Sequence, residues 1–260
     1  MKNESSQASA QRLISAAETL RNSAARLQLS GIGPIAYVYN PLDYAWEPHR
    51  RYLERFGRGN ARRAVFVGMN PGPWGMGQTG VPFGDPVMVR EWMGITGQVT
   101  APAHQHPKRP VLGFASRRRE PSGTRIYSWA RARWGTADAF FGDCFVANYC
   151  PLLLFDEAGN NITPAELRSA ERSALLMVCD AHLAVILTIF LPAFVIGVGN
   201  FAHDRSRAVV KQLNLSTCAG KILHPSPTNP QAQEGWSRIA ERQLQELGFV
   251  MPDTARPPGR

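Results

Sequence analysis

The chain has 260 residues, of which 44% are hydrophobic and 19% charged, as expected for a globular protein with a full core. Lysine and arginine number 29 against 20 acidic residues, and the net charge of +9 fits a polyanionic partner. Many basic proteins bind no nucleic acid, so charge alone decides little. The four cysteines form no C-x-x-C pair, which argues against zinc, iron–sulfur and redox motifs and suits a reducing compartment.

The predicted elements alternate between helices and short apolar strands. Hydrophobic residues at helical spacing predict an N-terminal helix over about residues 9–28, followed by an irregular aromatic stretch over 37–47. Four apolar runs have the composition of strands buried on both faces, over residues 64–69, 144–149, 193–198 and 220–223. Further helices are predicted over residues 47–56, 87–93, 123–134, 164–191, 200–213 and 230–247. This alternation predicts an α/β fold with a mostly parallel sheet.

The domain organisation is predicted to be simple. We expect one domain over residues 1–251, with residues 1–8 frayed and a disordered tail over 252–260. The apolar run 183–198 is short and is interrupted by Pro192, so we expect no membrane span. No secretory segment opens the chain, which favours a soluble intracellular protein.

The most informative loop follows the first strand and reads G-M-N-P-G-P-W-G-M-G-Q-T-G-V-P-F-G over residues 68–84. Neither the P-loop nor the G-x-G-x-x-G pattern is present, which argues against nucleotide binding through those motifs. Asn70 lies just past a core strand, where an amide could orient a water molecule, although a turn cap would also explain it. Phe83 could offer its face to a base, or it could be a core aromatic residue.

A second loop follows the fourth strand and reads H-P-S-P-T-N-P-Q-A over residues 224–232. Asn229 before Pro230 is a typical helix start, and Ser226 with the nearby backbone amides suits a phosphate group. His224 is held in a rigid loop at the carboxyl edge of the predicted sheet, where binding sites of such folds lie. It is therefore a candidate catalytic residue.

Asn148 interrupts the otherwise apolar second strand. Its amide can pair with an N3–H donor and an O4 acceptor at once, which is the edge that uracil presents and the opposite of the edge of cytosine. The alternative is an asparagine satisfied by the backbone alone.

The two loops, together with residues 109–113, 148–152 and 161–167, resemble the single-strand-selective monofunctional uracil-DNA glycosylases of the uracil-DNA glycosylase superfamily. The resemblance covers residues 37–248. It implies a three-layer αβα fold with a four-stranded parallel sheet. It also implies excision of uracil, and of 5-hydroxymethyluracil, from DNA in base excision repair, with no metal or cofactor.

The resemblance also implies a role for each candidate residue of the site. Asn70 positions the attacking water, and His224 stabilises the departing uracil anion at O2. Phe83 stacks on the flipped base, and Asn148 reads its edge.

Further residues are implied to shape the pocket and to contact DNA. Met69 and Gly72 line the pocket through their backbone, and Gly72 is expected to leave room at C5 for 5-substituted uracils. The segment 225–235 enters the DNA helix, and its DNA-binding candidates are Pro225, Ser226, Pro227, Thr228, Asn229 and Gln231. Thr228 departs from the arginine that is frequent at this position in the family, and this shorter, neutral side chain is expected to hold the extruded nucleotide in a duplex less firmly.

Two other functions stay open at this stage. One is a sister specificity for hypoxanthine or xanthine, and the other is a non-catalytic module that binds single-stranded DNA. The cluster Arg117–Arg119 is either a DNA contact or a solvated charge run. We expect a monomer that binds single-stranded DNA, with double-stranded DNA as a further candidate, located in the cytoplasm at the nucleoid of a bacterium or in the nucleus of a eukaryote.

Overall fold

A four-stranded parallel sheet forms the centre of the molecule, a computed structural model that describes residues 2–29, 35–59 and 61–253. The strands are β2 (Ala64–Gly68), β3 (Cys144–Asn148), β6 (Phe194–Val198) and β7 (Cys218–Ile222). Their order is β3-β2-β6-β7 and all three pairings are parallel, so the four carboxyl ends meet at one edge. The predicted α/β fold class with a four-stranded sheet is confirmed.

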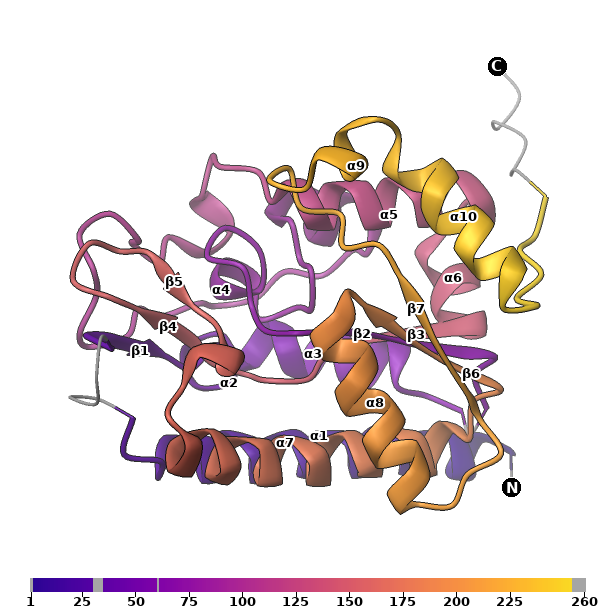
Figure 1. Cartoon of the computed structure of the whole chain (residues 1–260), viewed down its shortest axis with the longest axis horizontal. Coiled ribbons are helices and arrows are strands. Elements are labelled where there is room, and N and C mark those ends of the chain that lie inside the picture. Colours follow the sequence, from indigo (N-terminus) through magenta and orange to yellow (C-terminus); the bar gives the residue numbers. More distant parts are fainter. Residues whose placement is uncertain (1, 30–34, 60, 254–260) are drawn as a thin grey trace.

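Helices cover both faces of this sheet (Figure 1). One layer holds α1 (Lys2–Ala25), α3 (Trp46–Phe56), α7 (Ser169–Phe190) and α8 (Asn200–Gln212), and the other holds α5 (Pro121–Trp134), α6 (Ala137–Asp143) and α10 (Trp236–Glu246). Shorter elements complete the chain: α2 (Pro41–Tyr44), α4 (Met76–Thr79), α9 (Pro230–Gln233), a π turn over Met88–Trp92 and 3-10 turns over Gly113–Ala115 and Pro164–Glu166. The arrangement is the three-layer αβα architecture.

Several predicted boundaries are wrong. The N-terminal helix begins at Lys2 and ends at Ala25, because no glycine or proline interrupts the stretch that was expected to fray. The helix predicted over 230–247 is two helices, since Gly235 at φ 115° breaks it. Of the predicted disordered tail, residues 252 and 253 have no regular structure and the rest lies outside the described residues.

A second, three-stranded antiparallel sheet was not predicted. It consists of β1 (Tyr37–Tyr39), β4 (Leu153–Phe155) and β5 (Asn161–Ile162), in the order β1-β4-β5. The expectation of an irregular stretch over 37–47 is therefore wrong for most of its length, because β1, α2 (Pro41–Tyr44) and the start of α3 (Trp46) all fall within it. Strands this short do not show the period-two alternation by which a sequence reveals a strand.

Helix α7 is long and apolar enough to cross a membrane by length and composition, with a mean hydropathy of 2.1 over an 18-residue window. In the structure it lies along α1 and also contacts α8 (Figure 1). Its Leu175, Cys179 and Leu183 are buried against the core. We interpret α7 as part of the helical layer that covers the sheet.

Two histidines, the buried His49 and the half-buried His182, are expected to make the stability of this fold sensitive to acid. Burial lowers the pKa of His49 and of His182 to about 4 in each case, from an ordinary value of 6.5. Between pH 6.5 and about 4 the unfolded chain therefore binds protons that the native state does not. We expect the free energy of unfolding to be highest above pH 6.5 and to fall towards pH 4, by about 3 kcal/mol for one such histidine.

Urea unfolding at a series of pH values measures this effect. The variant His182→Leu replaces the imidazole with an apolar side chain that does not titrate, so the slope of stability against pH should decrease. A wild-type slope that is unchanged by this substitution would contradict the assignment to His182.

Candidate active site

The two loops singled out in the sequence converge at the carboxyl edge of the sheet. The loop after β2 supplies Phe83, and the loop after β7 supplies His224. Their ring centroids lie 6.4 Å apart with an interplanar angle of 42°. The aromatic ring and the imidazole therefore line the same site.

Gly68, the last residue of β2, shows how close Asn148 is to Phe83. A side chain on Gly68 would lie 2.6 Å from the ring of Phe83 and would also collide with Oδ1 of Asn148. Asn148 is the register partner of Gly68 on β3 and is 8% exposed. Only glycine fits at this position, and the ring and the amide meet above it.

The backbone of Phe83 is held in an unfavourable conformation. Its φ is 52°, in the left-handed region that bulky residues rarely adopt. Tyr127 Oη donates a hydrogen bond of 2.5 Å to the carbonyl of Pro82, and the N–H of Asp85 donates one of 2.8 Å to the carbonyl of Phe83. Gly123 on α5 packs so tightly against that same carbonyl that a side chain would not fit. Strain that its surroundings fix in this way is typical of functional sites.

Asn148 has an unused acceptor. Its Nδ2 donates to Sδ of Met76 at 3.2 Å, and its buried Oδ1 has no hydrogen-bond partner in the described part of the chain. An unpaired buried polar atom is costly, so its presence points to a ligand group that completes it. An imide N–H, such as N3–H of uracil, has the required chemistry.

His224 is held as a neutral hydrogen-bond donor. The backbone N–H of Ser226 donates to its Nδ1 at 3.1 Å, so Nδ1 is the acceptor and the proton lies on Nε2. Burial lowers the pKa of His224, which keeps the ring neutral at neutral pH. A neutral N–H donor can stabilise an oxyanion without carrying charge itself.

Asn70 lies two residues after the end of β2, at the start of the loop that also carries Phe83. Its Nδ2 is buried and makes no hydrogen bond to another described residue. The amide is therefore available to a water molecule or to a ligand. Met69 adjoins it and uses its carbonyl to accept the N–H of Cys150 at 2.9 Å, which fixes the start of the loop.

The loop after His224 is organised by its own hydrogen bonds. Ser226 Oγ accepts the N–H of Thr228 at 3.2 Å, and Oδ1 of Asn229 accepts the N–H of Gln231 at 3.1 Å, which confirms the predicted helix start. Arg125 on α5 donates to the carbonyl of Pro225 at 2.8 Å. Pro227 and Thr228 are exposed at the tip, where a partner molecule can reach them.

The surroundings of Gly72 differ from the prediction that this glycine leaves open space in the pocket. The position that its side chain would occupy is not free, because Oε2 of Glu120 lies 2.5 Å from it. Glu120 also packs against Gly75, and its Oε1 accepts the N–H of Ser122 at the start of α5. Burial raises the pKa of Glu120. No sequence pattern indicated that this carboxyl group would lie against the loop.

This packing predicts a specific coupling between two residues. Gly72→Ala should destabilise the protein by about 0.5–1 kcal/mol, because the new methyl group displaces the Glu120 carboxyl group, which is the far end of a flexible side chain and can move aside. In the double variant Gly72→Ala/Glu120→Ala the space is open, so the second substitution should recover part of that loss. Chemical denaturation of the four proteins of this cycle measures the coupling, and simple additivity would show that the two residues do not interact.

No group of three or more His, Cys, Asp or Glu side chains in the described residues is placed to hold a metal ion. The four cysteines are unbridged, and three of them are buried in the core. The site itself is made of the side chains described above. They can grip a flat polar ring between an aromatic face and an amide, and they can donate a hydrogen bond to negative charge on it.

A parallel αβα sheet with this constellation at its carboxyl edge defines an enzyme that acts on a nucleobase. A search of protein-family models found no match. Curated relatives are the single-strand selective monofunctional uracil-DNA glycosylases of Rattus norvegicus (46% identical over 233 residues, covering 90% of this chain and 84% of the relative) and of Bos taurus (46% over 225 residues, covering 86% and 82%). The chain belongs to the single-strand selective monofunctional uracil-DNA glycosylase family and is a DNA N-glycosylase, as the resemblance predicted.

A solved structure supports the fold independently. SMUG2 of Pedobacter heparinus aligns with a TM-score of 0.61 at 19% identity, covering 90% of this chain and 97% of that one. At this identity the likeness concerns the fold alone.

Proposed function

We propose that this protein excises uracil from DNA by extruding the nucleotide and hydrolysing its N-glycosidic bond, which initiates base excision repair. A base inside a duplex cannot be reached by these side chains, so the target must leave the stack. The observation that carries the proposal is the neutral Nε2–H donor of His224 beside the ring of Phe83, 6.4 Å between centroids.

The residues of the site match the steps of this reaction. The bond breaks through an oxocarbenium-like sugar, and uracil leaves as an anion. A hydrogen bond from His224 to O2 stabilises that anion by about 3 kcal/mol, by analogy with oxyanion donors. The amide of Asn70 orients the water that attacks the sugar. Neither loop contains lysine, so a Schiff-base lyase step has no nucleophile there.

The range of bases and the strand preference belong to the proposal as well. We propose that single-stranded DNA is preferred, because the short neutral side chain of Thr228 holds an extruded nucleotide in a duplex less firmly. That 5-hydroxymethyluracil is a second substrate rests on the family resemblance alone, since Glu120 fills the space beside Gly72 that was expected to admit it. Hypoxanthine also presents an N–H beside a carbonyl oxygen, and the unpaired Oδ1 of Asn148 could accept that N–H. Hypoxanthine is therefore an alternative substrate to uracil. We further propose that the protein acts as a monomer, in the compartment that holds the DNA.

The test is strand nicking by hot alkali after incubation with oligonucleotides that carry one uracil, 5-hydroxymethyluracil, hypoxanthine or xanthine, each in single and double strands. We expect uracil in single strands to be excised fastest. Faster excision of a purine would reverse the assignment in favour of the sister specificity. Binding without release of any base would favour a non-catalytic binding module.

A further inference from the structure

A basic groove lies beside the loop that carries Asn70. It is lined by Trp74, Lys108, Arg109, Ser116, Arg117 and Arg118, among others, and no acidic residue contributes to its wall. None of its four cations forms an ion pair within the described part of the chain. Lys108 and Arg109 instead donate to the backbone carbonyls of Ala158 and Gly159.

The three arginines of the cluster Arg117–Arg119, whose role the sequence left open, have different surroundings in the structure. Arg119 forms an ion pair of 2.8 Å with Asp85, whose side chain is fully buried, so it serves the packing of the loop that follows Phe83. Arg117 and Arg118 are exposed and lie in the groove. Of the three arginines in this cluster, Arg117 and Arg118 are therefore the two that form no ion pair with a described residue and can bind a partner.

Trp74 orients the groove cations. The guanidinium of Arg118 lies 4.3 Å from the centroid of its ring, and that of Arg109 lies 5.8 Å away. Stacking on an aromatic face restricts a long arginine side chain while its N–H donors stay free for an anion. Ser116 adds an independent indication of a ligand, because its hydroxyl group is buried, lines the same groove and has no partner among the described residues.

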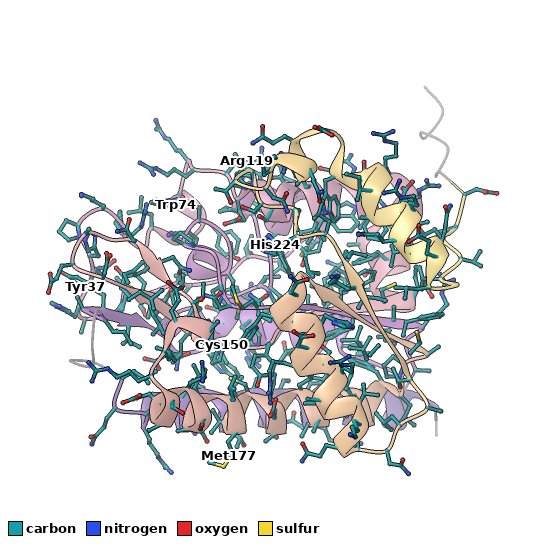
Figure 2. The ribbon with its side chains drawn as sticks, viewed as in Figure 1. Tyr37, Trp74, Arg119, Cys150, Met177 and His224 are labelled. Atoms are coloured by element: carbon teal, nitrogen blue, oxygen red, sulfur yellow. The ribbon has the colours of Figure 1, made fainter. Side chains whose placement is uncertain are left out.

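The groove is joined rigidly to the candidate active site by Gln78. The Nε2 of this buried side chain donates to the carbonyls of Pro73 at 2.8 Å and Pro110 at 3.0 Å, and its Oε1 accepts the N–H groups of Leu112 and Gly113. These four bonds link the loop of Asn70 to the opposite wall of the groove. Figure 2 shows Trp74 and His224 on the same side of the sheet, above the layer of α1 and α7.

We propose that this groove binds the phosphodiester backbone of the substrate strand next to the extruded nucleotide. The inference rests on the proposed function for the identity of the polyanion. Its own support is four unpaired cations, a free hydroxyl group and an oriented pair of guanidinium groups at a fixed place beside the site. Phosphate groups spaced along a strand match such a row of donors.

The experiment measures, by fluorescence anisotropy over a series of salt concentrations, how tightly the wild type and its variants bind a fluorescent single strand without uracil. The strand has about 20 nucleotides, which is longer than the stretch that one single-strand binding site covers. In Arg117→Ala/Arg118→Ala, the slope of log affinity against log salt should fall by about 1.4, and affinity at 0.1 M salt should fall about 10- to 30-fold. The control Arg12→Ala/Arg207→Ala removes the same charge from exposed positions on α1 and α8 and should bind like the wild type.

A second pair of variants tests the orienting role of Trp74. Trp74→Leu should weaken binding about 2- to 5-fold, and Trp74→Phe, which keeps an aromatic face, should restore it. Equal affinities and slopes for the groove variant and the control variant would overturn the proposal. Failure of the proposed function would be seen separately, as a wild-type protein that releases no uracil.

Discussion

Replacing His224 with leucine is expected to lower the single-turnover rate constant for uracil excision by about 10²- to 10³-fold. The reason is the loss of the Nε2–H donor that the Ser226 N–H holds in place by occupying Nδ1. Because burial lowers the pKa of His224, the donor is neutral through the neutral range, and the wild-type rate constant should change little there. It should change as the pH falls below the ordinary histidine value of 6.5, where the ring begins to bind a second proton at Nδ1 and loses the Ser226 bond.

Single-turnover kinetics on a uracil-containing single strand measure this effect. His104→Leu is a suitable control, because His104 is exposed and stacks on Tyr37, 4.7 Å between centroids. It should keep the wild-type rate constant. If His224→Leu affected only the substrate concentration needed for saturation, the imidazole would bind DNA without stabilising the leaving base.

The second large effect is expected at Asn148. Asn148→Leu removes the acceptor for N3–H and the donor for O4 but keeps the size of the side chain. A site built to hydrogen-bond its substrate discriminates strongly, so kcat/KM for uracil should fall about 10³-fold or more. The free protein should lose little stability, since the substitution removes a buried oxygen that has no partner in the described residues, together with only the N–H to Sδ bond to Met76.

This combination of lost activity and kept stability separates recognition from folding. Excision assays and urea unfolding of the same preparation give both quantities. A variant that excises uracil normally would show that the edge of the base is read elsewhere in the pocket.

The central sheet and the two loops could be predicted from the sequence because strands buried on both faces are continuous apolar runs, and residues 64–68 and 144–148 are buried throughout. The loops then fall at one edge, since parallel strands place their carboxyl ends together. This reasoning places His224, two residues after its strand, at that edge, whereas the place of Phe83 in the same site was implied by the family resemblance, because the residue lies 15 positions past the end of β2.

Other features depend on contacts between segments that no local pattern encodes. Glu120 meets Gly72 across 48 positions of the chain, and Gln78 reaches Pro110 across 32, so neither leaves a periodic trace in the sequence. The tautomer of His224 depends on one backbone N–H whose direction the loop geometry sets. The expectation of open space beside Gly72 was wrong because the absence of a side chain does not show what fills the space.

The most direct test of the account is the effect of His224→Leu on the excision of uracil compared with 5-fluorouracil. Fluorine makes the departing base a weaker base, so its anion needs less stabilisation from a hydrogen-bond donor. If His224 acts on the leaving anion, the variant should lose much less rate with 5-fluorouracil than with uracil. An equal loss for the two bases would contradict the role assigned to the imidazole.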